Sequence, residues 1–272
     1  MNMLIATDLD GTLLDHHSYA FDAALPALSL CDKHRIPVVF NTSKTATESE
    51  RLRRRLRNCH PFITENGSAA FIPQGYFRHM PEGCTQAGDY RVFRFGETLD
   101  AILTALAEIR QELHCDFAGF SDWTAQQVVE HTGLSLQAAH DAKQREFSEP
   151  LLWKGNDEEL RLFRGAVQER GLKLLQGGRF LHVLGDTDKG KAIIWLKAAY
   201  EGEADKPLTL VALGDSDNDV DMLEAADIAV LVRSPVRAMP VLQSGNRVIE
   251  TSGFGPAGWN EAIAGLLSES EI

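Results

Sequence analysis

Two aspartates, Asp8 and Asp10, follow a short apolar run near the start of the chain, in the stretch IATDLDGTLL. In an extended chain, side chains two residues apart point to the same side. The functional groups of open α/β sheets lie beyond the carboxyl ends of the strands, which is where Asp8 would stand. A single Asp-x-Asp-Gly is more often a turn than a catalytic site, so the pair needs a second observation.

A second acidic group, Gly214-Asp215-Ser216-Asp217-Asn218-Asp219, follows another apolar run, LTLVAL. Carboxylates at the ends of neighbouring parallel strands would repel one another, and a divalent cation removes that repulsion. Magnesium takes oxygen ligands, usually one or two carboxylates, a carbonyl, waters and a substrate phosphate. Asp219 by itself is also a good helix N-cap, but the two groups together predict a Mg²⁺ site.

Two further segments suit a phosphate group. Thr42 ends the stretch PVVFN and is followed by Ser43-Lys44-Thr45 at a predicted helix start, where hydroxyls and free backbone N–H groups attract anions. Lys189, in Asp188-Lys189-Gly190, opens a later helix. Each segment has a plainer explanation, a helix cap in the first and a solvated side chain in the second. Their order between the two acidic groups favours contacts with phosphate.

The elements that must position these residues alternate between short apolar strands and helices. Alternation of this kind predicts a parallel sheet covered on both faces. The capping-box spacing of Thr45 and Glu48 marks one helix start. The expected strands are 3–7, 37–41, 62–64, 208–213 and 228–232, and the expected helices are 22–34, the one from residue 45, 189–200, 219–226 and 258–267.

The sequence changes character after about Pro81. A half-exposed strand is expected at 90–95, in YRVFRF, and an amphipathic helix follows it. Further strands are expected at 116–120, 149–153, 172–176 and 180–184, with helical stretches among them. We therefore expect an α/β fold with a Rossmann-like parallel-sheet core, residues 1–82 and 186–272, and an inserted α+β domain, residues 83–185.

Bulk composition narrows the classes of function. The chain has 272 residues and a net charge of −12, which argues against general nucleic-acid binding because that favours a basic surface. No signal peptide is readable and no window is apolar enough to span a bilayer, so no membrane partner is expected.

The four cysteines form no Cys-x-x-Cys pair; they are Cys31, Cys59, Cys84 and Cys115. That spacing indicates free thiols in a cytoplasmic protein without zinc; the oligomeric state stays open.

Two histidines and a group of arginines stand out in the sequence, but neither set is expected to take part in the chemistry. His16 and His17 are expected to be loop residues without a chemical role. Leu52 and Leu56 are expected to face inward from a helix whose arginines form a solvated face. Those arginines are Arg51, Arg53, Arg54, Arg55 and Arg57.

The acidic groups, the threonine and the lysine occur in a known order. Asp-Leu-Asp-Gly-Thr-Leu-Leu after the first strand, Thr42 after the second, Asp188-Lys189-Gly190 and Gly214-Asp215-Ser216-Asp217-Asn218-Asp219 resemble the four motifs of the haloacid dehalogenase superfamily of phosphatases. The inserted domain resembles that superfamily's α+β cap. Thr42-Ser43-Lys44-Thr45, Glu65-Asn66-Gly67, Arg145-Glu146-Phe147 and Gly177-Gly178-Arg179-Phe180 look like the mannosyl-3-phosphoglycerate phosphatases, over nearly the whole chain.

The resemblance implies a role for each catalytic residue. Asp8 would attack phosphorus and form an aspartyl phosphate, and Asp10 would act as general acid and then general base. Asp219 would orient the metal's waters or Lys189. Thr42 and Lys189 would stabilise the phosphoryl oxygens. The expected Mg²⁺ ligands are Asp8, the backbone carbonyl of Asp10 and Asp215, with Asp219 beside them.

The resemblance also implies a substrate with a phosphate and a glycerate carboxylate, most simply mannosyl-3-phosphoglycerate. Cationic contacts are then needed, and Lys44, Arg145 and Arg179 are the candidates. Glu65 and Asn66 are candidates for sugar hydroxyls. The full expected substrate-binding set is Ser43, Lys44, Glu65, Asn66, Gly67, Arg145 and Arg179.

Three other functions remain open at this point. The first is a phosphatase for another sugar phosphate, such as glucosyl-3-phosphoglycerate or sucrose phosphate. The second is a phosphomutase on the same fold, which would return the phosphoryl group to a sugar. The third is a magnesium-dependent regulatory protein without turnover, which the presence of both Asp8 and Asp10 disfavours.

Overall fold

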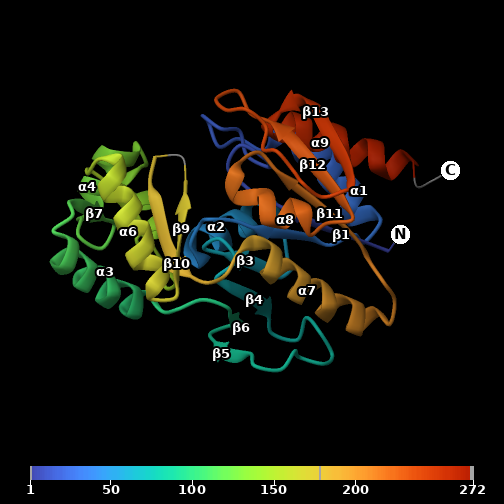
Figure 1. The fold of residues 1–272 in the computed structure, drawn as a ribbon. Helices are drawn as coiled ribbons and strands as arrows, with labels where there is room; N and C mark the ends of the chain where they lie inside the picture. The colour runs from blue at the N-terminus through green and yellow to red at the C-terminus, as the bar shows by residue number, and fades with distance from the viewer. Residues whose placement is uncertain (1, 178, 270–272) are drawn as a thin grey trace.

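The computed structural model describes residues 2–177 and 179–269 and divides them between two sheets (Figure 1). In that part of the chain the larger sheet has nine strands in the order β13-β12-β11-β1-β2-β3-β4-β6-β5. Neighbours from β13 to β3 run parallel, and β4, β6 and β5 extend the sheet antiparallel. The parallel strands are β1 (Met3–Thr7), β2 (Val38–Asn41), β3 (Phe62–Thr64), β11 (Thr209–Gly214), β12 (Ile228–Arg233) and β13 (Arg247–Phe254), and the antiparallel strands are β4 (Ala69–Pro73), β5 (Thr85–Ala87) and β6 (Tyr90–Arg94).

Helices cover both faces of this sheet, as the alternating pattern predicts. Within β1, Met3 and Ile5 pack toward α1, α2 and α9, whereas Leu4 and Ala6 pack toward α7 and α8. A strand buried on both faces reads as a continuous apolar run, which is why β1 was recognisable. The core helices are α1 (Leu25–Lys33) after the short 3₁₀ turn η1 (Asp22–Ala24), α2 (Ala46–Leu56), α7 (Lys189–Ala204), α8 (Val220–Glu224) after η2 (Asp217–Asp219), and α9 (Gly255–Glu269).

The second sheet belongs to the inserted domain and is antiparallel, in the order β7-β8-β10-β9. One face packs on α3 and α6 around Phe163 and Val183, and α4 and α5 cover part of the opposite face around Trp123. Figure 1 shows this domain as a separate lobe beside the core. Its elements are α3 (Leu99–Leu113), β7 (Phe117–Gly119), α4 (Ala125–Thr132), α5 (Leu136–Ala142), β8 (Ser148–Trp153), α6 (Asp157–Glu169), β9 (Leu172–Gln176) and β10 (Leu181–Gly185).

The expected α/β fold with an inserted α+β domain is confirmed, but the sheet extends past residue 82. β6 pairs with β4 and β5 pairs with β6, so both extend the core sheet, although residues 83–95 are expected from the sequence to belong to the insertion. We therefore propose that the insertion begins at Leu99, and "cap" refers from here on to residues 99–185. Gly178, part of the Gly177-Gly178-Arg179-Phe180 motif, lies outside the described residues.

The arginines of α2 do not all form a solvated face, and the expectation is wrong for Arg53. Its side chain is only 4% exposed. The guanidinium donates to Glu50, to the Tyr90 hydroxyl and to the His60 carbonyl, and it lies 4.5 Å over the Phe62 ring. An arginine can be buried where carboxylate, hydroxyl and carbonyl acceptors satisfy its fork of donors. Glu50 lies in the same helix, but Tyr90 and His60 belong to other segments, and the helix periodicity does not reveal them.

Candidate active site

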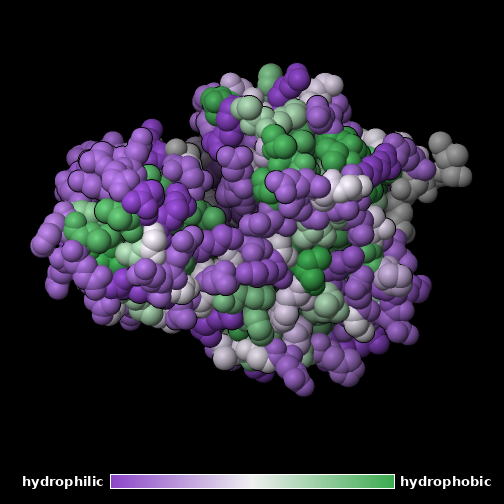
Figure 2. Space-filling view, in the orientation of Figure 1, coloured by the Kyte–Doolittle hydropathy of each residue, from purple (hydrophilic) through white to green (hydrophobic). Residues whose placement is uncertain are grey.

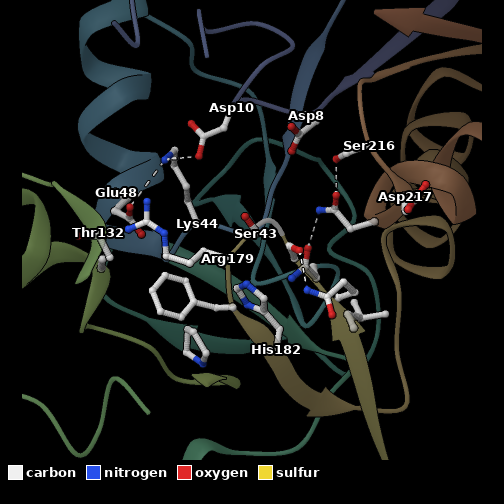
Figure 3. Close-up of a pocket in the computed structure, with 18 of the residues that line it drawn as sticks. Asp8, Asp10, Ser43, Lys44, Glu48, Thr132, Arg179, His182, Ser216 and Asp217 are labelled. Atoms are coloured by element: carbon white, nitrogen blue, oxygen red, sulfur yellow. Dashed lines mark hydrogen bonds and ion pairs between the residues drawn. The ribbon is translucent and has the colours of Figure 1, made fainter. Parts of the chain in front are cut away.

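A cavity of about 900 Å³ lies between the core and the cap. Its walls combine core residues that follow β1 and β2 with cap residues from the β9–β10 hairpin. In Figure 2 the surface is hollowed between the two lobes. Figure 3 shows Asp8 and Asp10 on one side of this cavity and His182 on the other. Both domains therefore form the walls of this cavity.

The two acidic groups meet at one end of the cavity. β1 and β11 are parallel neighbours, with Thr7 opposite Leu213, so the residues that follow them lie side by side. One carboxylate oxygen each from Asp8, Asp215 and Asp219 lies within 4.8 Å of the other two, and all three side chains are buried. The prediction that the acidic groups converge is confirmed. The Asp10 side chain is not part of this cluster.

Lys189 lies between two of these aspartates. Its ammonium group donates to Asp8 Oδ1 at 2.7 Å and to Asp219 Oδ1 at 2.6 Å, and the side chain has no exposed surface. The Asn41 side-chain amide at the end of β2 donates to the Lys189 carbonyl at 2.9 Å, which fixes the first turn of α7. Although burial disfavours a charged lysine, the carboxylates of Asp219 and Asp8 raise the pKa of Lys189 above its ordinary value. The site therefore contains a permanent cation beside Asp8.

Asp219 organises the acidic loop. Its Oδ2 atom accepts hydrogen bonds from the backbone N–H groups of Asp215 and Ser216, both at 3.1 Å, while Oδ1 accepts from Lys189. Both oxygens are thus engaged by the protein. Asp219 is expected to orient either the metal's waters or Lys189, and the geometry favours the second role, because both of its oxygens are already held by Lys189 and the loop.

The cluster fits a magnesium ion. Asp215 Oδ2 is buried and has no hydrogen-bond partner among the described residues, and a buried acceptor without a partner is destabilising. Burial raises the pKa of Asp8 to about 8. The positive charge of Lys189 opposes this rise, and the negative charges of Asp219 and Asp215 add to it. Burial and the Asp219 charge raise the pKa of Asp215 to about 6. A hard divalent cation supplies the positive charge that these carboxylates lack.

These raised pKa values predict a pH-dependent affinity for Mg²⁺. Below about 6, both Asp8 and Asp215 hold protons that a cation must displace, and above about 8 neither does. Mg²⁺ affinity should therefore rise between pH 6 and pH 8, with up to two protons released per ion. Titration calorimetry in two buffers of different ionisation enthalpy measures both quantities. A pH-independent dissociation constant over this range would contradict the assignment of the site.

Gly11 allows the first loop to approach the second. It has a positive φ of 84°, and a Cβ at this position would lie 2.6 Å from Asp215 Oδ2. Only glycine adopts this backbone region without steric cost. The end of β1 has a further support in Trp259, a fully buried residue of α9 whose Nε1 donates to Thr7 Oγ1 at 3.0 Å. Nothing in the local sequence around Asp8 indicates this distant tryptophan.

Asp10 faces Lys44 across the mouth of the site. Lys44 Nζ lies 2.7 Å from Asp10 Oδ2 and 3.8 Å from Glu48 Oε1, and it sits 5.3 Å over the Tyr19 ring. Although burial disfavours its charge, the carboxylates of Asp10 and Glu48 raise the pKa of Lys44. Asp10 Oδ1 is buried without a partner among the described residues. Asp10 therefore has one oxygen held by Lys44 and one without a partner.

Some residues of the segment after β2 line the cavity, and others are buried behind its wall. Ser43 and Lys44 line the cavity, whereas Thr42 is buried behind them and its Oγ1 accepts from the Lys44 backbone N–H at 3.2 Å. Asn66 also lines the cavity, and its Oδ1 accepts from the Asn218 amide at 3.2 Å. A Cβ on Gly67 would lie 2.1 Å from the Asp188 carbonyl oxygen. Gly67 is thus a packing position behind the site.

Glu65 connects the core to the cap. Its carboxylate accepts from the backbone N–H groups of Glu146 and Phe147, at 3.0 and 3.1 Å, and from the Ser148 hydroxyl at 2.6 Å. Arg145 lies 3.7 Å from the same carboxylate and donates to the Ser43 carbonyl, which brings it to the cavity wall. We therefore propose that Glu65 binds the cap to the core, and that it does not contact sugar hydroxyls as the resemblance implies.

Glu65→Ala should lower the free energy of unfolding by about 3 kcal/mol, because removing one partner of a buried ion pair leaves the other uncompensated. The amides of Glu146 and Phe147 should also exchange faster with solvent. Urea unfolding and hydrogen exchange measure the two effects. Glu130→Ala, at an exposed helical glutamate of the cap, is the control. Equal stability of the two variants would show that Glu65 does not connect the domains.

Arg179 and several residues without a sequence signal complete the cavity. Arg179 lines it from the β9–β10 hairpin and donates to the His131 carbonyl. His16 lies in a turn after β1, as expected of a loop residue, yet it also lines the cavity. Four further lining residues have no signal in the sequence: Tyr19, Phe120, His182 and Arg237.

Comparison with known families identifies two matching segments. Residues 5–78 match the family model of haloacid dehalogenase-like hydrolases. Residues 121–264 match the model of sucrose-6F-phosphate phosphohydrolases. The first match contains the Asp8 loop and the segment after β2, and the second contains Lys189 and the Asp215 loop.

Two curated relatives match the chain from end to end. A glucosyl-3-phosphoglycerate/mannosyl-3-phosphoglycerate phosphatase of Methanococcoides burtonii is 38% identical, and 99% of each chain is covered. A protein of the same name from Persephonella marina is 36% identical, with coverage of 99% of this chain and 98% of the relative. Among solved structures, Thermoplasma acidophilum 0175 has the same fold, with a TM-score of 0.68, 17% identity and coverage of 98% and 99%.

Proposed function

Because this chain belongs to the haloacid dehalogenase-like hydrolases and is a phosphoric monoester hydrolase, we propose that it removes phosphate from a hexosyl-3-phosphoglycerate. Mannosyl-3-phosphoglycerate is the first candidate and glucosyl-3-phosphoglycerate the second. The observation that carries this proposal is one cavity with an acidic cluster at one end and four cationic side chains along its walls. Those side chains are Lys44, Arg145, Arg179 and Arg237, and Arg237 lies beside the acidic cluster, 4.0 Å from Asp215 Oδ2.

The first half-reaction transfers the phosphoryl group to Asp8. Lys189 holds Asp8 Oδ1, which leaves Oδ2 to attack phosphorus. The bond from Oδ2 to phosphorus forms as the ester bond to the glycerate oxygen breaks, and Asp10 donates its proton to that oxygen. In the second half-reaction, water attacks phosphorus, Asp10 accepts a water proton, and the Asp8 carboxylate is regenerated as phosphate leaves.

Charge neutralisation accounts for most of the expected rate gain. Lys189 places a buried cation against Asp8, where negative charge develops on the phosphoryl oxygens. Asp8 and Asp215, with the Asp10 carbonyl, would hold Mg²⁺, which supplies Lewis-acid polarisation of the phosphoryl group when bound. Thr42 supports this end of the site from behind Lys44.

Anionic groups on the remainder of the substrate fit the positive walls. A glycerate carboxylate is best bound beside a cation, and a guanidinium group can donate two parallel hydrogen bonds to a carboxylate. Arg145 presents a buried Nε without a partner among the described residues, and Arg179 reaches the same cavity from the β9–β10 hairpin of the cap (Figure 3). Sucrose phosphate carries no carboxylate that these cations could bind.

A phosphate-release screen tests the proposal. The purified protein is assayed with Mg²⁺ on mannosyl- and glucosyl-3-phosphoglycerate, sucrose 6F-phosphate and p-nitrophenyl phosphate, with EDTA as control. We expect the highest kcat/KM for a hexosyl-3-phosphoglycerate. The match of residues 121–264 to sucrose-6F-phosphate phosphohydrolases makes that ester the second candidate, and a preference for it would contradict the proposal. Product analysis separates hydrolysis from isomerisation by a phosphomutase.

A further inference from the structure

His182 lies on the cap wall of the cavity, opposite the acidic cluster. It is the second residue of β10, between Leu181 and Val183, whose side chains pack into the cap core. Successive side chains of a strand point to opposite faces, so His182 points away from that core. Figure 3 shows its ring facing the side of the cavity that holds Asp8 and Asp10.

The imidazole has no hydrogen-bond partner within the described residues. Nδ1 is buried and unpaired, and Nε2 has no bond to the described part of the chain either. Buried polar groups in proteins are almost always paired, and leaving one unpaired is destabilising. A ring with two unpaired nitrogens at the edge of a large cavity indicates that its partner is a ligand of that cavity.

The charge state of His182 limits what this ligand group can be. Burial, together with the positive charges of Arg145 and Lys189, lowers the pKa of His182 to about 3. The ring is then neutral at physiological pH, with one nitrogen donating and the other accepting. A group that both donates and accepts complements this ring, and a hydroxyl does so. Carboxylate and phosphate groups are better served by the cations elsewhere in the cavity.

The immediate surroundings of His182 suit a sugar ring. Its cross-strand neighbours, Pro150 and Leu175, line the cavity with it, as does Phe120. A Cβ on Gly177 would lie 2.9 Å from His182 Nε2, so the glycine gives the imidazole room over the hairpin backbone. Apolar surface beside a few polar groups is the usual composition of a small-molecule site.

We propose that His182 is a specificity-determining residue that hydrogen-bonds a hydroxyl of the substrate's sugar. This inference deepens the proposed function and rests on it only in that the substrate is a sugar phosphate ester. Three parts of the cavity then bind three parts of the substrate. The acidic cluster binds the phosphoryl group, the cations bind the carboxylate, and the wall formed by β8 and β10 binds the sugar.

The test compares His182→Phe with wild type on the preferred sugar phosphate and on p-nitrophenyl phosphate, which has no sugar hydroxyl. We expect KM for the sugar ester to rise about 10-fold with kcat nearly unchanged, since a lost hydrogen bond between neutral groups changes binding by a factor of this order. The rise for p-nitrophenyl phosphate should be much smaller. His182→Gln, which keeps a donor and an acceptor, should restore part of the loss.

The matched control is His140→Phe, at an exposed histidine of α5 in the same domain, which should leave both KM values unchanged. Equal effects of His182→Phe on the two esters, or a loss in kcat alone, would overturn the inference. If wild type prefers sucrose 6F-phosphate, the proposed function fails, and the same comparison on that ester decides the role of His182. If no sugar phosphate is hydrolysed, both fail.

Discussion

Asp8→Asn is expected to abolish phosphate release, with kcat at least about 10,000-fold below wild type. The amide cannot act as the attacking nucleophile, and removal of a covalent nucleophile costs losses of this order or larger in other enzymes. Phosphate release from the preferred sugar ester and from p-nitrophenyl phosphate measures the effect. Both esters should lose activity equally, because Asp8 acts on the phosphoryl group that they share.

A folding control makes the Asp8 result interpretable. In EDTA, wild type contains three buried aspartates near one another and one lysine. The neutral amide removes a desolvated charge and its repulsion with Asp215 and Asp219, so the variant should be at least as stable as wild type in thermal unfolding. Asp186→Asn, at an exposed aspartate, should retain full activity. Substantial turnover by Asp8→Asn would refute the nucleophile assignment.

Lys189→Met is expected to lower kcat/KM about 1,000-fold. Loss of one preorganised donor to a developing negative charge costs about 100- to 1,000-fold in other enzymes, and Lys189 also neutralises Asp8 and Asp219 before the substrate binds. Methionine keeps most of the side-chain volume, so packing in the first turn of α7 is preserved. Steady-state kinetics at saturating Mg²⁺ measure the loss.

Lys191→Met is the matched control for Lys189→Met. It lies two residues further along α7, its side chain is 55% exposed, and it pairs at 3.4 Å with the exposed Asp186 and more loosely, at 3.6 Å, with Asp188. Activity should stay within about 2-fold of wild type, since exposed ion pairs contribute little. If both lysine variants lost activity alike, the effect would belong to the helix and not to the buried ammonium group.

Much of the core and its acidic cluster could be predicted because the relevant signals are local. β1 and β3 have the expected bounds, since strands buried on both faces are continuous apolar runs. The capping box at Thr45 is present with both of its hydrogen bonds. The convergence of Asp8 and Asp215 follows from topology alone, because the carboxyl ends of parallel strands lie at one edge of the sheet.

The missed elements depend on long-range pairing. β4, β5 and β13 have no strong period of their own, and β6 has the half-exposed pattern of an edge, so their membership of the core sheet comes from their partners. The position of a domain boundary then shifts with them. Arg53 is buried for the same reason, because its acceptors lie in three different segments.

Substrate-binding residues were the hardest to predict. Glu65 carries a functional-looking side chain, yet the amides that occupy it come from the cap, 81 and 82 residues further along. His182 sits in an ordinary strand sequence, LHVLG, and becomes notable only when the cap sheet faces the acidic cluster across a cavity. Side-chain orientation relative to a second domain is not encoded in any short sequence window.

The central claim is that Asp8 accepts the phosphoryl group, and chemical trapping tests it most directly. Wild type is quenched in acid during turnover of its preferred ester with Mg²⁺, reduced with borohydride and digested, and the peptides are analysed by mass spectrometry. The account predicts an acyl phosphate at Asp8, converted by reduction to homoserine at position 8, with no such product in Asp8→Asn. A trapped phosphoryl group on any other residue would contradict it.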